Sequence, residues 1–214
     1  MQTVAILSQK GGAGKTTLTL HLASAAASAG RNVAIIDLDP QASAAKWADR
    51  REVELPVVIS AHASRLKNEL ERVAELEGDL TLLDTAPHSD SAALEAAKAA
   101  DLILVPCRPA ILDLEAISST IDLVRAVNPN IYVVMNAVAP QGNETAEAIE
   151  AISALGVKVC PVQTVQRVAF SRALISGQTA QEYEPEGKAA KEANELYQFM
   201  AEQLNAKPVE QGAA

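Results

Sequence analysis

Residues 8–17 read Ser8-Gln9-Lys10-Gly11-Gly12-Ala13-Gly14-Lys15-Thr16-Thr17, and the organisation of the whole chain can be worked out from them. The apolar run 4–7 before this stretch is typical of a buried strand, and the alanine- and leucine-rich residues 18–29 after it predict a helix. A strand, a glycine-rich turn and a helix are the context of a phosphate-binding loop. Glycines let the backbone wrap closely around phosphate oxygens, and backbone N–H groups together with the positive end of the helix dipole then face the anion.

Two side chains of this stretch carry the expected chemistry. Lys15 supplies a mobile positive charge for the β- and γ-phosphates, and the Thr16 hydroxyl is placed where Mg²⁺ can bind it. The alternative is a glycine-rich turn that holds a lysine by chance. The Gly-Lys-Thr sequence between a strand and a helix favours the phosphate loop.

Composition and charge narrow the class of protein. The chain has 214 residues, of which 49% are hydrophobic but only 3% aromatic, so its core must consist mainly of Ala, Val, Leu and Ile. The net charge of −9 argues against a general nucleic-acid coat, although residues 1–36 and 151–181 contain no Asp or Glu. Cys107 and Cys160 lack metal-site spacing, and we expect buried thiols at strand ends in a reducing cytoplasm.

Apolar strands alternate with helical segments along the chain, which predicts an α/β fold with a mostly parallel, twisted sheet covered by helices on both faces. The expected strands are residues 4–7, 33–36, 57–59, 80–83, 102–105, 131–135 and 157–159. The expected helices are residues 18–29, 43–51, 66–74, 91–100, 113–127, 144–155, 167–175 and 187–204. Asp113 is a candidate N-cap, and Pro106 is expected to stop its strand. We expect one P-loop NTPase domain over residues 1–205 and a flexible tail over 206–214.

Ligands of such sheets bind beyond the carboxyl ends of the strands. The residues expected at that edge are Lys15, Asp37, Asp39, Asp84, Pro106 and Asn136. Asp84 is a candidate Mg²⁺ site residue that holds a metal-bound water, and its alternative role is a cap for the helix that starts near Ser89. Asp37 and Asp39 would point to opposite faces of an extended strand and so take different roles, unless Asp39-Pro40 only forms a turn.

The octet Lys10-Gly11-Gly12-Ala13-Gly14-Lys15-Thr16-Thr17 resembles the deviant Walker A loop, K-G-G-x-G-K-T-T, of the ParA/MinD family of ATPases. This resemblance implies that ATP is bound by the loop and that Lys10 crosses a dimer interface to the partner's nucleotide. The implied nucleotide-binding residues are Lys10, Gly11, Gly12, Ala13, Gly14, Lys15, Thr16, Thr17 and Asn136. For Asn136 and the 162–167 loop, which lie in position for the base, capping and turn roles are the alternatives.

Other segments extend the resemblance. Asp37-Leu38-Asp39-Pro40-Gln41 is similar to the family's D-x-D-P-Q segment, which implies that Asp39 positions the attacking water and that Asp37 lies near the metal. Asp84-Thr85-Ala86-Pro87 resembles the switch segment D-x-x-P. Gln166-Arg167 and the helix after it resemble the small partition ATPases that lack an N-terminal DNA-reading domain.

The resemblance implies a weak, Mg²⁺-dependent ATP hydrolase in the cytoplasm, which forms an ATP-dependent homodimer and binds DNA of the nucleoid without sequence preference. The expected function is segregation of plasmid or chromosomal DNA with a ParB-type adaptor. The alternatives are positioning of a protein cargo such as a carboxysome, a metabolic P-loop synthetase, and a module that holds ATP without hydrolysis. Residues 206–214 do not read as a basic amphipathic membrane helix, so no membrane partner is expected.

The DNA surface is expected to be local because the protein is acidic. The candidate residues are Arg167, Arg172, Lys188 and Lys191. Lys188 and Lys191 share a helix face, whereas Arg167 and Arg172 stand about 140° apart on an ideal helix, so that both reach one phosphate backbone only if Arg167 lies in the cap. The alternative is that these four are ordinary solvated charges.

Overall fold

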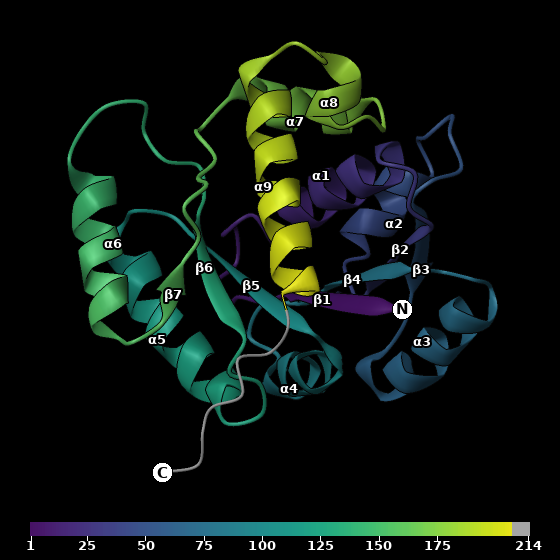
Figure 1. Cartoon of the computed structure of the whole chain (residues 1–214), viewed down its shortest axis with the longest axis horizontal. Helices are drawn as coiled ribbons and strands as arrows, with labels where there is room; N and C mark the ends of the chain where they lie inside the picture. The colour runs from purple at the N-terminus through teal and green to yellow at the C-terminus, as the bar shows by residue number, and fades with distance from the viewer. Residues whose placement is uncertain (207–214) are drawn as a thin grey trace.

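The computed structural model describes residues 1–206, so that nearly all of the predicted tail 206–214 lies outside the described residues. Its centre is a sheet of seven strands in the order β3-β2-β4-β1-β5-β6-β7, and every neighbouring pair is parallel (Figure 1). The strands are β1 (Gln2–Ile6), β2 (Val33–Asp37), β3 (Val57–Ser60), β4 (Leu80–Asp84), β5 (Leu102–Cys107), β6 (Ile131–Met135) and β7 (Lys158–Val159). The predicted α/β fold with a parallel sheet is confirmed.

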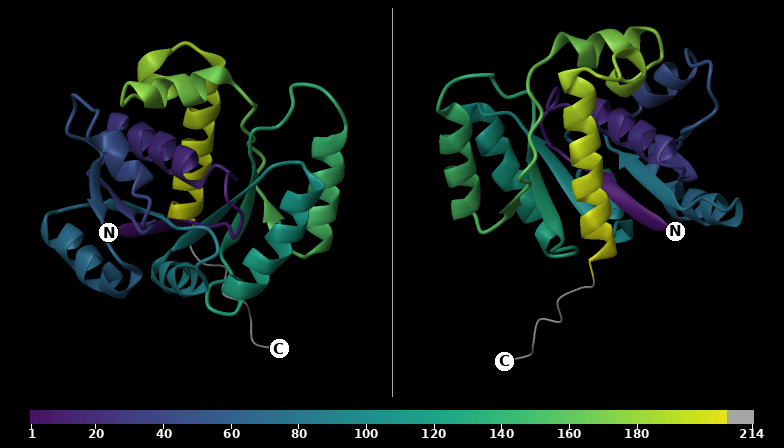
Figure 2. Two further views of the ribbon diagram at one scale, coloured as in Figure 1. Left: turned by 180° about the vertical axis from the view of Figure 1, so that it is seen from behind. Right: turned by 45° about the horizontal axis from the view of Figure 1, so that its top comes forward.

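Helices cover the sheet on both faces (Figure 2). They are α1 (Lys15–Ser28), α2 (Ser43–Ala48), α3 (Leu66–Glu75), α4 (Asp90–Ala99), α5 (Ile111–Arg125), α6 (Glu144–Ala154), α7 (Val168–Ile175), α8 (Ala180–Tyr183) and α9 (Lys188–Asn205), with a 3-10 turn, η1 (Ala63–Arg65), before α3. The short helix α8 was not predicted, because four residues are too few to show a helical period.

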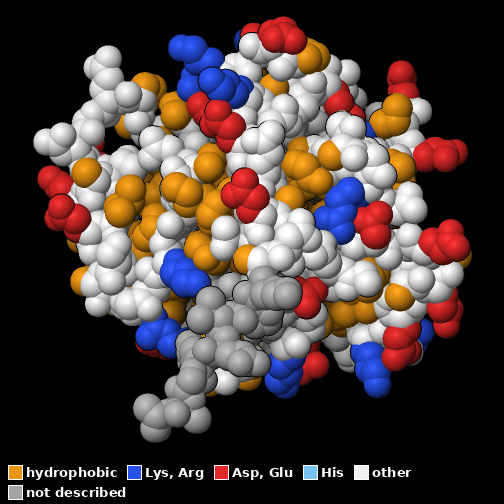
Figure 3. All heavy atoms as spheres, viewed as in Figure 1, with side chains coloured by type: hydrophobic (Ala, Val, Ile, Leu, Met, Phe, Trp, Pro, Cys, Tyr) orange, Lys and Arg blue, Asp and Glu red, His pale blue; other side chains and the backbone are white. Residues whose placement is uncertain are grey.

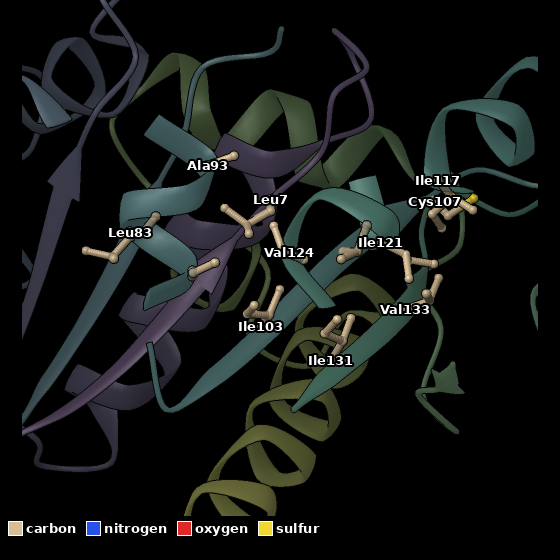
Figure 4. Packing of buried hydrophobic residues seen from close by; sticks show 14 of the residues in the cluster. Leu7, Leu83, Ala93, Ile103, Cys107, Ile117, Ile121, Val124, Ile131 and Val133 are labelled. Atoms are coloured by element: carbon tan, nitrogen blue, oxygen red, sulfur yellow. The ribbon is translucent and has the colours of Figure 1, made fainter. Parts of the chain in front are cut away.

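Alternate residues of the central strands point into two separate cores, which explains why these strands are apolar throughout. Ala5 and Leu7 pack with α3, α4, α5 and α6, whereas Val4 and Ile6 pack with α1, α2 and α9. Figure 4 shows the first core, in which Leu7, Leu83, Ile103, Ile131 and Val133 of the sheet region lie with Ile117, Ile121 and Val124 of α5. The only tryptophan, Trp47, is buried in the second core and anchors α2.

Two local predictions were wrong. Strand β5 continues through Pro106 to Cys107. The backbone groups of Leu104 and Pro106 face β1, but β1 pairs with β5 no further than Leu104. The missing N–H of Pro106 therefore interrupts no ladder. Helix α5 begins at Ile111, so Asp113 lies within its first turn rather than at the N-cap, which is Ala110. Cys107 and Cys160 are buried at strand ends as expected.

Candidate functional site

The phosphate loop joins the end of β1 to α1, and its shape depends on two glycines. Gly12 and Gly14 have φ angles of 76° and 98°, in the left-handed region that glycine adopts without strain. A Cβ on Gly14 would also lie 2.1 Å from Nδ2 of Asn136. Both the backbone conformation and the closeness of Asn136 therefore require glycine at this position.

Lys15 turns back over the loop from the first position of α1. Its side chain is 6% exposed, and its Nζ donates to the carbonyl oxygens of Ser8, at 3.1 Å, and Lys10, at 3.4 Å. Burial lowers the pKa of Lys15, and the nearby carboxylates of Asp84 and Asp39 oppose that shift. The ammonium group is thus held at the loop by weak, replaceable carbonyl contacts, which a phosphate could displace.

Asp84 is the strongest indication of a ligand-binding site. It ends β4, opposite Ile6 of β1 and Asp37 of β2, and it is completely buried. Neither of its carboxylate oxygens has a hydrogen-bond partner among the described residues. Burial raises the pKa of the Asp84 carboxyl to about 7, while the neighbouring Thr16 and Lys15 side chains favour the ionised form. A buried carboxylate without a partner is costly, so its environment is arranged for a group that is bound from outside.

These features fit Mg²⁺, which prefers oxygen ligands and keeps several waters. Among residues 1–206, no three His, Cys, Asp or Glu side chains cluster in a way that could hold a metal ion unaided. An Mg²⁺ ion bound here would take few ligands from the protein and would complete its coordination with phosphate and water oxygens. Asp84 and Thr16 are the side chains that would hold it. The alternative helix-cap position belongs to Ser89, which precedes α4.

Asp37 and Asp39 have different surroundings, as their spacing predicts. The Asp37 carboxylate is buried and accepts the backbone N–H groups of Asp39, Ala44 and Ala45, at 3.1, 2.9 and 3.3 Å. The Asp37 carboxylate therefore fixes the start of α2. Its oxygens accept these hydrogen bonds, whereas those of Asp84 accept none from residues 1–206. Burial raises the pKa of Asp37, and the three amides oppose this.

Asp39 is only half-buried and belongs to an open cavity of about 520 Å³. The loops that follow β2, β3 and β4 form this cavity, and it reaches the switch residues Ala86 and Pro87. One Asp39 oxygen accepts the N–H of Gln41, at 2.9 Å. Asp39 also contributes to the electrostatic environment of Lys15 and Asp84. It is thus close to the phosphate loop and accessible to water.

The Lys10 side chain is partly exposed, at 32%, and contacts helix α5. Its Nζ forms an ion pair with Asp113 of α5, 2.5 Å from Oδ2. Sequence reasoning missed this partner, because the two residues are 103 positions apart and Asp113 was assigned to a helix cap. Only the buried position of Asp113 in the first turn of α5 distinguishes it from an ordinary helix carboxylate.

Asn136 braces the phosphate loop. Its Nδ2 donates to the carbonyl of Ala13, at 2.7 Å, and its Oδ1 accepts the hydroxyl of Thr164, at 2.5 Å. Asn136 and residues 164–168 also line a cavity of about 610 Å³ that opens beside Gly14 and Thr17. The cavity is large enough for a nucleoside, so the contact between this region and the base stays a prediction.

The four candidate DNA residues are divided by the structure. Arg167 is the N-cap of α7, but its guanidinium group is paired with Glu192, at 2.6 Å from Nη2. Lys191 lies 3.8 Å from Glu195 in an exposed pair. Arg172 and Lys188 are exposed, and neither forms an ion pair with any residue of the described chain. Figure 3 shows basic side chains lying beside acidic ones on the face that carries α9.

No helix within residues 1–206 combines the length and the apolar character that crossing a bilayer requires.

Comparisons with known proteins agree with this geometry. The CobQ/CobB/MinD/ParA nucleotide binding domain matches residues 4–180. Over 211 residues the chain is 36% identical to "Maintenance of carboxysome distribution protein A" of Gloeobacter kilaueensis, covering 95% of this chain and 94% of that protein. The protein of the same name from Halothiobacillus neapolitanus is 29% identical, over 94% and 95% of the two chains. A Cyanothece McdA variant in complex with ATP has the same fold, with a TM-score of 0.77 at 19% identity and 99% coverage of both chains.

Proposed function

Because the chain belongs to the CobQ/CobB/MinD/ParA nucleotide-binding family, we propose that it is an Mg²⁺-dependent ATPase that dimerises with ATP and positions a protein cargo, such as a carboxysome, on the nucleoid. The observation that carries the proposal is the buried carboxylate of Asp84, which lies close to Lys15 and Thr16 and whose two oxygens accept no hydrogen bond from residues 1–206. A structural carboxylate would be paired, whereas this one suits a metal and nucleotide.

Each loop residue has a distinct task in this proposal. The backbone of residues 11–16 binds the phosphates, and Lys15 neutralises the charge that develops on the transferred phosphoryl group. Mg²⁺, held by Asp84 and Thr16, would supply a second positive charge at the phosphate oxygens. Asp39, which is open to water, holds the attacking water, and Asp37 keeps the Asp39 segment and α2 in place through its three backbone contacts.

The surface beside the loop supports self-association. Ile111 and Leu112 open α5 with exposed fractions of 73% and 63%, and they directly precede Asp113, the partner of Lys10. Two large apolar side chains next to a phosphate loop are costly in water and are covered when a second subunit packs there. This location agrees with a nucleotide-bridged dimer in which Lys10 reaches the partner's phosphate.

The cargo is inferred from the relatives. Two proteins named for the maintenance of carboxysome distribution align with nearly the whole chain. Protein-cargo positioning is therefore better supported than segregation of plasmid or chromosomal DNA, which stays the second candidate because "Protein ParA" of Rhizobium radiobacter is 28% identical over 80% of this chain. An adaptor protein that links the ATPase to its cargo is part of either version.

The biochemical test uses Lys10→Ala. We expect this variant to bind ATP nearly as the wild type does in calorimetry, but to fail to form the ATP-dependent dimer in light scattering and to hydrolyse no ATP. Lys67→Ala is the matched control, because Lys67 is an exposed lysine far along the chain. A normal ATP-dependent dimer of Lys10→Ala would remove Lys10 from the interface.

The cargo test is genetic. Deletion of the gene in its source cell should leave protein compartments clustered while plasmid retention stays at the wild-type level. The opposite outcome, plasmid loss with normally spaced compartments, would establish DNA segregation instead. The product of the neighbouring gene provides a second measurement, because addition of the true adaptor should raise the ATP turnover of the purified protein.

A further inference from the structure

The short helix α8 is bound to α1, the helix that begins at the phosphate loop (Figure 1). Nε2 of His21 in α1 accepts the N–H of Ala180, at 3.0 Å, and Nε2 of Gln181 donates to the carbonyl of His21, at 3.0 Å. Because Nε2 accepts, Nδ1 carries the ring proton and donates to the carbonyl of Thr17, at 2.7 Å. Burial lowers the pKa of His21 to about 4, so the ring is neutral near pH 7. His21 therefore connects α8 to the first turn of α1.

The same helix is also bound to the segment that follows α2, through the ion pair of Glu182 and Arg51. Nη2 of Arg51 lies 2.7 Å from Oε1 of Glu182, and Nη1 lies 3.0 Å from Oε2. Oε2 also accepts the N–H and the hydroxyl of Thr179, at 2.6 and 3.0 Å, which caps α8. The Arg51 side chain is 4% exposed. A two-point contact between a guanidinium group and a carboxylate fixes the relative position of both partners.

Further contacts hold the end of α2 against the turn between α7 and α8. Nε1 of Trp47 donates to the carbonyl of Gln178, at 3.2 Å, and Nη1 of Arg51 donates to that of Gly177, at 2.8 Å. The two backbones approach closely, because a Cβ on Gly177 would lie 2.5 Å from the carbonyl oxygen of Arg50. The Arg51 guanidinium group also lies over the Trp47 ring, 4.3 Å from its centroid. The end of α2 is thus held on several sides.

The other end of α2 is joined to the segment that is proposed to hold the attacking water. The N–H of Ala42 donates to the carbonyl of Asp39, at 2.8 Å, and Nζ of Lys46 donates to that of Gln41, at 2.8 Å. Helix α2 has only six residues, which span about 9 Å. A shift at its far end would therefore also move the Asp39 segment.

We propose that Glu182 is a positioning residue for ATP hydrolysis, which holds Asp39 in place through Arg51 and α2. Since α8 is also bound to α1 through His21, the Asp39 segment and the phosphate loop are both held by one short helix. The inference rests on the proposed function, because it concerns the water that Asp39 is proposed to hold. The backbone of the loop binds the phosphates, whereas hydrolysis also needs an aligned water, so loss of the ion pair should lower turnover more than affinity.

The test is Glu182→Gln, which keeps the size of the side chain and removes its charge. We expect the single-turnover rate of ATP hydrolysis to fall by about 10- to 100-fold, since a small misplacement of reacting groups has an effect of this order. Affinity for a non-hydrolysable ATP analogue, measured by calorimetry, should stay at the wild-type value.

The matched control is Asp79→Asn. Asp79 likewise pairs with an arginine, Arg31, and accepts a backbone N–H, that of Asn32, but it precedes β4 and so lies at the opposite edge of the sheet from Asp84. This variant loses the same kinds of contact at a place that is remote from the phosphate loop. It should hydrolyse ATP at the wild-type rate.

Two double variants identify the residues through which Glu182 acts. The variant with both Arg51→Gln and Glu182→Gln should be no slower than the slower single variant, because each change removes the same ion pair. In the Asp39→Ala background, Glu182→Gln should cause no further loss of rate, because the water is no longer held. A full additional loss in either background would overturn the proposal.

Wild-type turnover of Glu182→Gln would also overturn it, as would equal losses of rate and affinity, which a role in stability alone predicts. If circular dichroism shows that Glu182→Gln is unfolded, Arg51→Lys is measured in its place, since lysine keeps the charge but not the two-point contact. Turnover of Arg51→Lys at the wild-type rate would again contradict the proposal.

The same measurements separate this inference from the proposed function. A wild type that neither binds the ATP analogue nor hydrolyses ATP would refute the proposed function and the inference together. A wild type that hydrolyses ATP, together with a Glu182→Gln variant that does so at the same rate, would refute the inference alone.

Discussion

Charged side chains gather in two regions of the molecule, and they are held differently in each. One region is the phosphate-loop edge of the sheet. The other, which we call the outer end of α7 and α9, contains Arg167, Arg172, Lys188 and Lys191. At the edge, Asp84 is completely buried and has no hydrogen-bond partner among residues 1–206, and Lys15 donates to carbonyl oxygens. At the outer end, Arg167 is closely paired with Glu192, and Lys191 lies near Glu195. The first region has charge that its own chain does not satisfy, whereas much of the charge in the second is already neutralised.

This contrast shows which signal is useful for finding a site. Exposed cations paired with neighbouring glutamates contribute little to stability and tell little about function. A buried carboxylate without a partner costs free energy in the isolated chain, and it is retained where a ligand repays that cost. The residue types alone predicted both regions. Among residues 1–206, the first has a buried carboxylate without a partner, whereas Arg172 and Lys188, the unpaired cations of the second, are exposed to water.

Asp39→Ala is expected to have the largest effect on the site at the phosphate-loop edge of the sheet. Because Asp39 is expected to position the attacking water, we expect the ATP turnover rate to fall by about 10²- to 10⁴-fold. Phosphate binding does not use this side chain, so the ATP-bound dimer should accumulate. Single-turnover hydrolysis and light scattering measure the two effects. The control is Asp49→Ala, an exposed aspartate at the end of α2, and turnover of Asp39→Ala at the wild-type rate would assign the water to another residue.

Asp84→Asn tests whether the unpaired carboxylate destabilises the chain without nucleotide. The folded-state pKa of about 7 lies above the ordinary value of 3.8, so the wild type loses stability as pH rises through this interval. At pH 8, without Mg²⁺ or ATP, the variant should have a higher free energy of unfolding, by up to about 4 kcal/mol. Near pH 4 the two proteins should be alike.

Urea unfolding at the two pH values measures this difference in the free energy of unfolding. The control is Asp90→Asn, because Asp90 is an exposed aspartate. Addition of ATP and Mg²⁺ should reverse the order, since only the wild type retains the carboxylate for the metal. A variant that is less stable than the wild type at pH 8 without ligand would show that Asp84 has a structural role instead.

Lys15→Ala should weaken ATP binding by about 10- to 150-fold, because a charge-assisted contact contributes ~1.5–3 kcal/mol. Calorimetry with ATP and Mg²⁺ measures the loss. Lys98→Ala, which removes an exposed lysine paired with Glu95, should bind as the wild type does. Unchanged affinity of Lys15→Ala would refute the assignment of the phosphate loop.

The smallest expected effect concerns the outer end of α7. If the ATP dimer binds DNA there, Arg172→Ala should flatten the slope of log affinity against log salt by about two, because a dimer loses two phosphate contacts. Arg167→Ala should change the slope less, since Glu192 already neutralises Arg167. Filter binding over a salt series compares them. Equal slopes for Arg172→Ala and the wild type would exclude this surface.

Local sequence was sufficient for the order of the seven strands and of the longer helices, and for the glycine-rich turn between β1 and α1. The apolar strands and the Gly11–Thr17 run carry short-range signals, because strand burial on both faces and close approach to phosphate each demand particular residue types at adjacent positions. The end of β5 at Cys107 was predicted wrongly, because it depends on where the neighbouring strand β1 stops. The start of α5 at Ile111 was also predicted wrongly, because the role of Asp113 depends on its distant partner Lys10.

What the sequence alone determined is therefore the parallel α/β fold, the phosphate loop and the set of aspartates at one sheet edge. The tertiary structure decided which of these groups are satisfied. Asp37 is bound to the start of α2, and Asp84 has no hydrogen-bond partner within the described chain, 1–206. Lys10 is paired with Asp113 and Arg167 with Glu192. The physical reason is that hydrogen bonds and ion pairs join residues that are distant in the sequence, such as Lys10 and Asp113, 103 positions apart, whereas sequence patterns record only short-range periodicity.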